Sequence, residues 1–233
     1  MRSFIDRWLY REYADCWDEL MLRSRILDHA GSTKILLDVG AGRGCKKHFD
    51  FRKEFSWVAG CDVSSDVHEN PYLSYALVIK DGRMLFADRQ FDVVFSSSVI
   101  EHVDDIDKHF EEIKRVLKPG GVFVAKTPNK RHYVALIASC TPDWFHEMVN
   151  RWRGRATRDT FPTHYRCNTP HMIEQSLERH GFSQITVETI EGRPEYCRIF
   201  SPLYLLGACY ERLVNCCQLF APFRAVMLVT AQV

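Results

Sequence analysis

The sequence predicts an α/β fold in which a mostly parallel β-sheet is covered by helices on both faces. Three observations support this fold class. Short apolar runs alternate with segments of helical periodicity, the first run (residues 34–39) opens into a loop containing glycines at 40, 42 and 44, and the second ends in an acid at Asp62. Because parallel strands need a crossover connection that is usually helical, this alternation favours a parallel sheet.

The first half of the chain supplies most of the predicted sheet. Residues 4–30 place apolar side chains at steps of three and four, which predicts one amphipathic helix. Four apolar runs then predict strands at residues 34–39, 57–62, 76–79 and 91–97. Residues 104–118 return to helical spacing and stop at the sequence Lys-Pro-Gly-Gly, and a fifth strand is expected at 122–126.

The second half breaks this rhythm at residues 130–168, a segment rich in aromatic and arginine residues. It is too long for an ordinary connection, so we expect a lid inserted over a site. Thr169 as N-cap, Pro170 as first helical residue and Gly181 past the end frame another helix. Further elements are expected as a strand at 184–190, an additional helix at 201–220 and a last strand at 224–232.

Bulk properties restrict the class of protein. The 233 residues are enough for one domain, read as 1–233 with its core at 30–130. Lys plus Arg number 31 and Asp plus Glu 30, so no broad basic surface for nucleic acid is expected. Nine cysteines without a CxxC pair, and histidines without metal-site spacing, predict reduced thiols and no metal. The first ten residues lack the pattern of a signal peptide, so a cytoplasmic protein is expected.

The glycine loop from Asp38 to Gly44 carries the first chemical signal. Glycines at a strand end permit a tight turn and let a ligand approach the main chain, although a purely structural turn is the alternative. The dinucleotide fingerprint G-x-G-x-x-G would require Gly or Ala at position 45, which is cysteine. The spacing is instead G-x-G-x-G, preceded two residues earlier by an acid.

This loop and four later segments resemble the class I S-adenosylmethionine-dependent methyltransferases. The matching segments run in order through residues 38–44, 60–62, 81–92, 96–103 and 113–121. The resemblance implies a Rossmann-like, doubly wound, seven-stranded and mostly parallel sheet with an antiparallel last strand. It also implies S-adenosylmethionine (SAM) as cofactor and methyl transfer as activity.

The resemblance assigns cofactor roles to particular residues. Asp38 orders the loop, and the methionine portion of SAM lies against Gly40, Gly42 and Gly44. Asp62 grips the ribose, since an ionised carboxylate can accept two hydrogen bonds from vicinal hydroxyls. Without the glycine loop, a strand-end acid such as Asp62 would be read as merely solvated.

Three further residues complete the expected cofactor site. The resemblance makes Asp81 the acceptor for the adenine amino group and Gly82 the point where the ring approaches the backbone. An ordinary Asp-Gly turn is the alternative for this pair. Ser97, at the end of the fourth strand, is expected to line the methyl-transfer face.

The acceptor side of the site is less sharply defined. His102 follows the fourth strand and is a candidate general base if the acceptor must lose a proton. From the lid, the candidate acceptor-binding residues are Trp144, His164, Tyr165 and Arg166, which combine apolar walls with polar or cationic groups. We expect a small or lipid-like acceptor. The alternative is a non-catalytic SAM-binding module of the same fold.

Residues 201–220 form a mostly apolar segment whose purpose the resemblance does not explain. Glu211 and Arg212 at mid-segment argue against a transmembrane span. One reading is a helix packed on the sheet edge or on the lid. The other gives the helix an apolar face that caps the acceptor pocket or makes a peripheral membrane contact. That face comprises Leu203, Leu206, Tyr210, Leu213 and Cys217. The sequence makes no prediction of oligomeric state.

Overall fold

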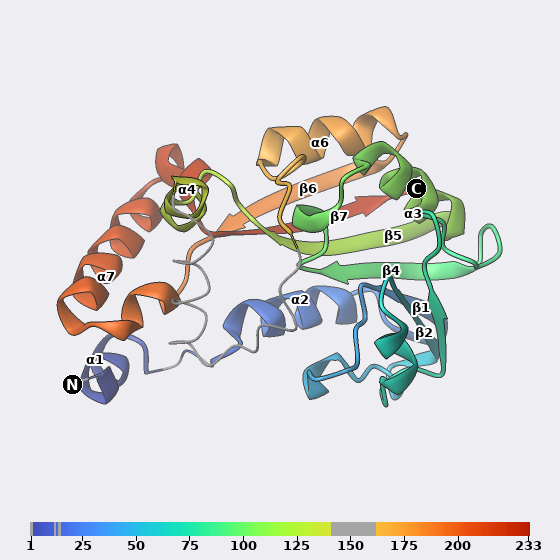
Figure 1. Ribbon diagram of the computed structural model, residues 1–233, viewed down its shortest axis with the longest axis horizontal. Helices are drawn as coiled ribbons and strands as arrows, with labels where there is room; N and C mark the ends of the chain where they lie inside the picture. The colour runs from blue at the N-terminus through green and yellow to red at the C-terminus, as the bar shows by residue number, and fades with distance from the viewer. Residues whose placement is uncertain (1, 12, 14, 141–161) are drawn as a thin grey trace.

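The structure, a computed structural model, describes residues 2–11, 13, 15–140 and 162–233. Its centre is a seven-stranded sheet in the order β3-β2-β1-β4-β5-β7-β6 (Figure 1). The neighbours from β3 to β5 pair in parallel, whereas β7 runs antiparallel to both β5 and β6. The predicted mostly parallel sheet with an antiparallel last strand is confirmed. The strands are β1 (Gly31–Val39), β2 (Phe55–Asp62), β3 (Tyr75–Val78), β4 (Phe91–Ser97), β5 (Leu117–Pro128), β6 (Ser183–Ile190) and β7 (Val226–Gln232).

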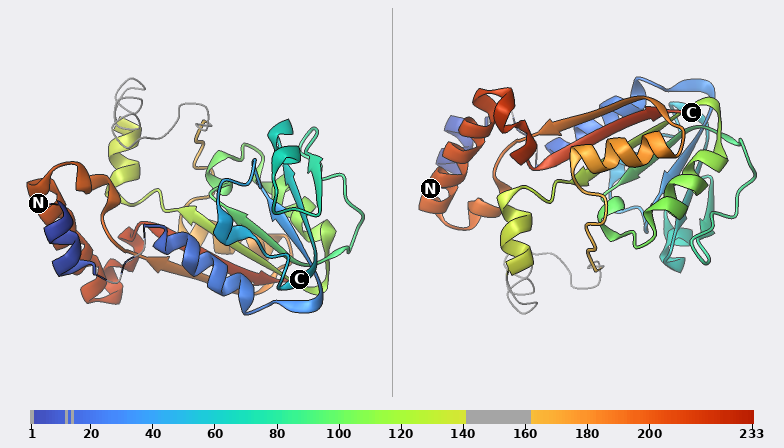
Figure 2. Two further views of the ribbon diagram at one scale, coloured as in Figure 1. Left: turned by 90° about the horizontal axis from the view of Figure 1, so that it is seen from below. Right: turned by 90° about the horizontal axis from the view of Figure 1, so that it is seen from above.

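Helices cover both faces of the sheet, as predicted (Figure 2). On one face α2 (Trp17–Leu27) packs with Val93 of β4 in one apolar cluster. On the other, α3 (Ile106–Val116) and α6 (Pro170–Arg179) pack with the next residue, Val94. Successive side chains of a strand point to opposite faces, so a strand buried on both faces is apolar throughout. This accounts for the continuous apolar runs of the sequence.

Short connections replace crossover α-helices between the first four strands. The 3₁₀ turn η1 (Lys47–Phe49) lies between β1 and β2, and η2 (Ser65–Glu69) lies between β2 and β3. Residues 79–90, which the structure describes in full, join β3 to β4 without an α-helix. After β4 comes η3 (Ile100–His102).

The leading helix predicted at residues 4–30 is wrong in its continuity. Two helices occupy this region, α1 (Arg2–Leu9) and α2, and the chain turns between them. Directly after α1, the Tyr10 ring stacks on Tyr204, with centroids 5.8 Å apart, and the Tyr10 hydroxyl donates to Glu211 at 3.2 Å. These partners lie about 200 residues away, so local periodicity carries no trace of them.

Two predicted boundaries can be compared with the structure directly. The Thr169 hydroxyl accepts from the Met172 amide at 3.3 Å, and Gly181 has φ +74°, which confirms both ends proposed for α6. The fifth strand, expected to begin at residue 122, begins earlier at Leu117. Leu117 already pairs with Phe91, and the register shifts before the regular ladder resumes.

The remaining helices gather at one end of the molecule, near the carboxyl ends of β5 and β6 and the start of β7 (Figures 1 and 2). There α7 (Ser201–Cys216) packs against α1, and both contribute to a small apolar cluster with Cys197. Between β6 and α7 lies η5 (Glu195–Ile199), and η6 (Gln218–Phe223) follows α7. The insert predicted to be a lid contains α4 (Tyr133–Cys140), and the ring centroid of Tyr133 lies 4.8 Å from that of Tyr210 in α7. Among the described residues, no helix has the length and hydropathy of a membrane span.

Candidate functional site

The carboxyl ends of β1 and β4 define the candidate site. These strands are neighbours in the sheet although they are not consecutive in the chain, so the strand order reverses between them. In open α/β sheets, ligands bind in the crevice at such a reversal. The glycine loop leaves β1 here, and residues 97–102 leave β4.

The three loop glycines adopt positive φ angles of +79°, +50° and +76° at Gly40, Gly42 and Gly44. A Cβ at Gly40 would collide with Val99 from the loop after β4, and one at Gly44 would collide with Asn70. At Gly42 a Cβ would meet nothing within 4 Å. Packing therefore requires two of the glycines, and the third leaves its backbone open to a ligand.

Hydrogen bonds hold this loop in place. The Gly40 amide donates to the Cys61 carbonyl at 2.8 Å, which ties the loop to the end of β2. The Asn70 amide nitrogen donates to the carbonyls of Ala41 at 3.0 Å and Gly42 at 3.2 Å. Asn70 is a positioning residue that the sequence analysis missed, because nothing in its local sequence points back to the loop.

Two carboxylates face the same region from the ends of β1 and β2. Asp38 is buried, and burial together with the nearby Asp62 carboxylate raises its pKa to about 8, against an opposing effect of Lys46. Asp62 accepts from the Gly42 amide at 2.9 Å through one oxygen and from the Ser64 amide at 2.8 Å through the other. Each carboxylate oxygen has a second lone pair, so Asp62 can still bind a diol.

The site therefore fits the cofactor implied by the sequence. SAM carries an ammonium and a sulfonium, and two neighbouring acids favour a cationic ligand. The open backbone at Gly42 provides space, and Asp62 provides acceptors for ribose hydroxyls. The SAM-binding roles of Asp38, Asp62 and the three glycines remain predictions of the sequence that this geometry supports.

Asp81 and Gly82 form a tight turn after β3. Their φ angles are +51° and +71°, and Lys80 pairs with Arg83 across the turn. This is the ordinary Asp-Gly turn that stood as the alternative. The Asp81 carbonyl accepts from the Lys108 ammonium, and both turn residues are exposed. The adenine role of this pair stays a prediction.

Ser97 ends β4 with a hydroxyl that is buried and has no hydrogen-bond partner in the described part of the chain. Ser98 next to it has φ +60°, so the chain turns sharply here. An unpaired buried hydroxyl is costly unless a ligand or water satisfies it. The position agrees with the predicted place of Ser97 beside a bound ligand.

His102 lies in η3, directly beyond this turn. Its Nδ1 is 2.8 Å from the Pro162 carbonyl oxygen, which can only accept, so Nδ1 carries a proton. Nε2 lies 4.0 Å from Oε1 of Glu101. His102 is thus placed as a candidate proton acceptor, with the Glu101 carboxyl group beside it.

Glu101 is the second residue missed by the sequence analysis. Its side chain is buried, and burial raises its pKa. The carboxylate accepts from the Thr127 hydroxyl at 3.0 Å, and that hydroxyl accepts from Asn168 at 2.7 Å. An acid next to a histidine is a common sequence feature, so it does not predict that Glu101 is buried. The burial of Glu101 depends on Thr127 of β5 and on Asn168, which are distant in the sequence.

Two of the predicted acceptor-binding residues contact the main chain of Glu101. The main-chain amides of His164 and Tyr165 donate to the main-chain carbonyl of Glu101 at 2.8 and 3.2 Å. Arg166 instead pairs with Asp104 at 2.7 Å on the surface and lines an open groove of about 500 Å³ between α3 and α6. Trp144, the fourth predicted acceptor residue, lies outside the described residues.

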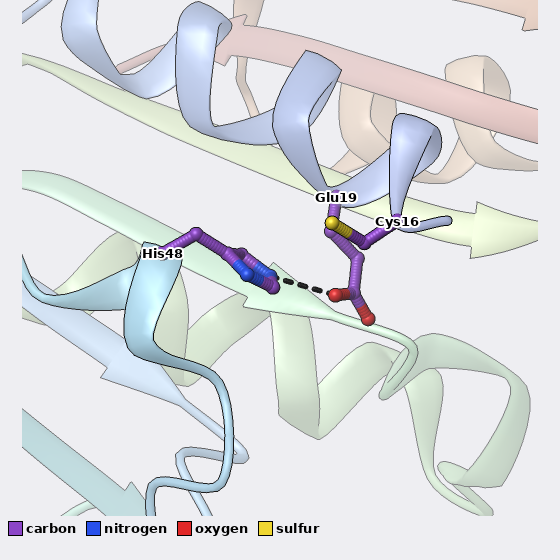
Figure 3. Close-up of side chains that lie close together, drawn as sticks. All are labelled: Cys16, Glu19 and His48. Atoms are coloured by element: carbon purple, nitrogen blue, oxygen red, sulfur yellow. Dashed lines mark ion pairs between the residues drawn. The ribbon is translucent and has the colours of Figure 1, made fainter. Parts of the chain in front are cut away.

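Cys16, Glu19 and His48 form a cluster that the sequence analysis did not foresee (Figure 3). Their ligand atoms lie within 4.8 Å of one another, as a metal site would require. Glu19 already has two nitrogen partners, however: Nε2 of His48 lies 2.6 Å from one carboxylate oxygen and the Lys46 ammonium 2.5 Å from the other. These pairings indicate that Glu19 links α2 to the segment after the glycine loop, and they do not favour a metal site.

A doubly wound sheet with a glycine loop and strand-end acids at its reversal point defines a class of ligand-binding α/β domains. Comparison with known sequences identifies the family. The family model described as "Methyltransferase domain" matches residues 6–187, and the chain belongs to this methyltransferase family. The family recognised in the sequence is thereby confirmed.

Curated relatives share moderate identity with the chain. A ubiquinone biosynthesis O-methyltransferase from Rhodopseudomonas palustris is 34% identical over 167 residues, which cover 66% of this chain and 59% of the relative. Its counterpart from Nitrobacter winogradskyi is 27% identical over 154 residues, covering 60% and 58%. The matched part thus spans about three fifths of the length of these relatives.

Solved structures share the fold. A SAM-dependent methyltransferase from Archaeoglobus fulgidus superposes with a TM-score of 0.61 at 17% identity, covering 99% of this chain and 98% of the other. The Haemonchus contortus phosphoethanolamine N-methyltransferase 2, in complex with phosphomonomethylethanolamine and S-adenosylhomocysteine, gives 0.58 at 20% identity, covering 99% and 59%. At these identities the likeness concerns the fold.

Proposed function

We propose that this protein binds SAM at the β1 and β4 strand ends and transfers its methyl group to a small or lipid-like acceptor. The observation that carries the proposal is the glycine loop: packing requires Gly40 and Gly44 to be glycine, while the space beside the Cα of Gly42 is open next to Asp62. Family membership supports the same activity. The curated relatives named for ubiquinone biosynthesis support a small or lipid-like acceptor.

SAM supplies a methyl group on a positive sulfur that leaves as a neutral thioether. An acceptor lone pair forms the new bond to carbon while the old sulfur-carbon bond breaks, and its electron pair stays on sulfur. Such an in-line displacement depends mainly on alignment and close approach of the two reactants. The loop, Asp62 and Ser97 would hold SAM for this displacement.

A hydroxyl acceptor must also lose a proton. Pro162 fixes the tautomer of His102, so Nε2 is the nitrogen that takes this proton. The Glu101 carboxyl group beside Nε2 stabilises the imidazolium that results. Glu101 thus acts through His102 and is a positioning residue.

Titration calorimetry of the full chain with SAM, S-adenosylhomocysteine and NAD tests cofactor binding. We expect both adenosyl compounds to bind and NAD not to bind; tight binding of NAD alone would refute the cofactor assignment. A screen with isotope-labelled methyl SAM over quinone-like, lipid, sugar-nucleotide and protein pools then tests transfer. Binding without transfer to any pool would favour the non-catalytic module.

A further inference from the structure

A lysine and an aspartate form an ion pair beside the candidate site. The Lys126 ammonium, near the carboxyl end of β5, lies 2.6 Å from Oδ2 of Asp18 in the first turn of α2. The Lys126 side chain is 6% exposed, whereas that of Asp18 is 27% exposed. Burying a charge is costly unless hydrogen bonds satisfy its remaining donors, so the surroundings of Lys126 are informative.

Most of the hydrogen-bonding capacity of this ammonium is unused. An ammonium has three N–H donors. In the described part of the chain, Nζ of Lys126 has one hydrogen-bond partner, the Asp18 carboxylate. The register partner of Lys126 on β4 is Ser97, whose buried hydroxyl has no partner among the described residues either. Unused polar groups on two paired residues favour a ligand at this place.

Lys126 and Ser97 point to the sheet face that α2 covers. Phe95 of β4 and Val124 of β5 pack in one apolar cluster with Leu22 of α2. Ser97 and Lys126 come two positions later in the same strands. Side chains two positions apart in a strand point to the same face, so both residues lie on the α2 side of the sheet.

The first turn of α2 connects β5 with the segment after the glycine loop. Asp18 pairs with Lys126, and the next residue, Glu19, pairs with His48 in η1 (Figure 3). The end of β4 lies between these two anchor points, because β4 stands between β1 and β5 in the sheet. Burial raises the pKa of Glu101 after β4, and the Lys126 ammonium opposes that rise. The charge of Lys126 therefore acts within the candidate site.

We propose that the ion pair of Lys126 and Asp18 binds the amino-acid end of SAM. This end is a zwitterion with one carboxylate and one ammonium. Lys126 offers N–H donors to the carboxylate, and Asp18 keeps lone pairs for the ammonium, so charges of opposite sign alternate. A ligand that carries only an anion fits less well, because the Asp18 carboxylate beside Lys126 repels it.

The strand order agrees with this placement, which rests on the proposed function. Asp62, the expected ribose acid, ends β2, and the sheet continues from there as β1, β4 and β5. A cofactor with its ribose at β2 and its sulfur at the reversal between β1 and β4 directs its remaining chain toward β5. Neighbouring strands lie about 4.8 Å apart, a gap that the long side chain of Lys126 can bridge.

Titration calorimetry of the full chain with two cofactor compounds tests the assignment. Decarboxylated SAM keeps the adenosine, the sulfonium and the amine, and lacks only the carboxylate. Wild type should bind SAM about 10-fold or more tightly than decarboxylated SAM, the size of one hydrogen bond between charged groups. In Lys126→Met this preference should disappear. Decarboxylated SAM should bind that variant at least as tightly as wild type, because a nearby positive charge is removed.

Lys118→Met is the matched control. Lys118 lies at the other end of β5 and also pairs with an aspartate, Asp92, at 2.7 Å. This variant should keep the wild-type preference for SAM. Asp18→Asn should weaken the binding of both compounds, since both carry the ammonium. If circular dichroism shows that Lys126→Met is unfolded, the double variant of Lys126→Met with Asp18→Asn, which leaves no lone charge, should show the same loss of preference.

Two results separate failure of this assignment from failure of the proposed function. If SAM binds wild type and the preference for SAM persists in folded Lys126→Met, the ion pair only holds α2 to β5, and the assignment is overturned alone. The same holds if wild type binds both compounds equally. If neither compound binds wild type, the SAM assignment of the whole site is overturned together with the role of Lys126.

Discussion

The Gly42 amide donates a hydrogen bond to the Asp62 carboxylate at 2.9 Å, which links the open position of the glycine loop to the acid at the end of β2. One carboxylate thereby has two tasks. It holds the loop through its bonds to Gly42 and Ser64, and it keeps lone pairs for a ligand. Substitutions at either residue should therefore lower the affinity for the cofactor more than they lower the stability of the fold.

Asp62→Ala should weaken SAM binding by about 10-fold to 100-fold. The variant loses two charge-assisted hydrogen bonds to the ribose hydroxyls, which together cost about 1.5 to 3 kcal/mol of binding free energy. Calorimetry with SAM measures the change, and circular dichroism checks that the fold remains. Asp107→Ala, which removes an exposed carboxylate in α3, is the matched control and should bind normally. A folded Asp62→Ala protein with unchanged affinity would refute the ribose role.

Gly42→Val should abolish measurable SAM binding, since a branched side chain would occupy the open space above the loop. Backbone strain alone is controlled by Gly120→Val. Gly120 also has positive φ, at +78°, and a Cβ there would meet only Gln232 at 3.8 Å, far from the loop. Both variants should lose similar stability in urea unfolding, and only Gly42→Val should lose the cofactor. Equal SAM affinity in the two variants would show that the loop does not bind it.

Asp38→Asn should stabilise the free protein, and the gain should grow with pH. Burial and Asp62 raise the pKa of Asp38 from 3.8 to about 8, so the folded chain holds a proton that the unfolded chain releases. Wild-type stability therefore falls as pH rises from about 4 to about 8, and asparagine removes this loss. Urea unfolding of both proteins at several pH values measures the difference, which should level off above pH 8.

The opposite result, a variant whose advantage is constant across this range, would show that Asp38 ionises normally. Binding should change in the other direction. A cationic ligand favours the ionised form of Asp38, which asparagine cannot adopt, so the same variant should bind SAM more weakly than wild type, most clearly above pH 8.

His102→Ala should lower kcat by about 100-fold or more for a hydroxyl acceptor, the size typical of lost general-base catalysis, with SAM affinity unchanged. His171→Ala is the control, because His171 is exposed on α6. Glu101→Gln should lower kcat less and shift the pH profile of kcat, as expected for a residue that acts through His102. If kcat of His102→Ala matches that of His171→Ala, the reaction needs no base at this position.

A feature of this structure could be predicted from the sequence when it depends on residues close together in the chain. The caps of α6, such as Thr169, follow local rules and were predicted, whereas the start of β5 at Leu117 was not. The break after α1 was not predicted either, and the Tyr10 side chain that follows α1 contacts Tyr204 and Glu211, which are distant in the sequence. The glycine loop is a local motif, whereas Asn70 and Glu101 acquire their roles only from partners on other strands.

The contact between Tyr10 and Glu211 joins the two ends of the chain and should contribute to stability. Glu211 is 2% exposed and accepts from the Tyr10 hydroxyl at 3.2 Å and from Asn215 at 2.8 Å. Burial and the nearby carboxylate hold the pKa of Tyr10 well above its usual value, so the phenol stays a donor. Tyr10→Phe should therefore cost about 0.5 to 1.5 kcal/mol of unfolding free energy.

Glu211→Ala should cost more, about 3 kcal/mol, because Tyr10 and Asn215 both lose their acceptor and a cavity remains. Glu174→Ala, which removes an exposed carboxylate of α6, is the control and should change stability by less than about 0.5 kcal/mol. A double-mutant cycle of Tyr10→Phe with Glu211→Gln then isolates the contact. Additive effects would show that the hydroxyl and the carboxylate are not coupled.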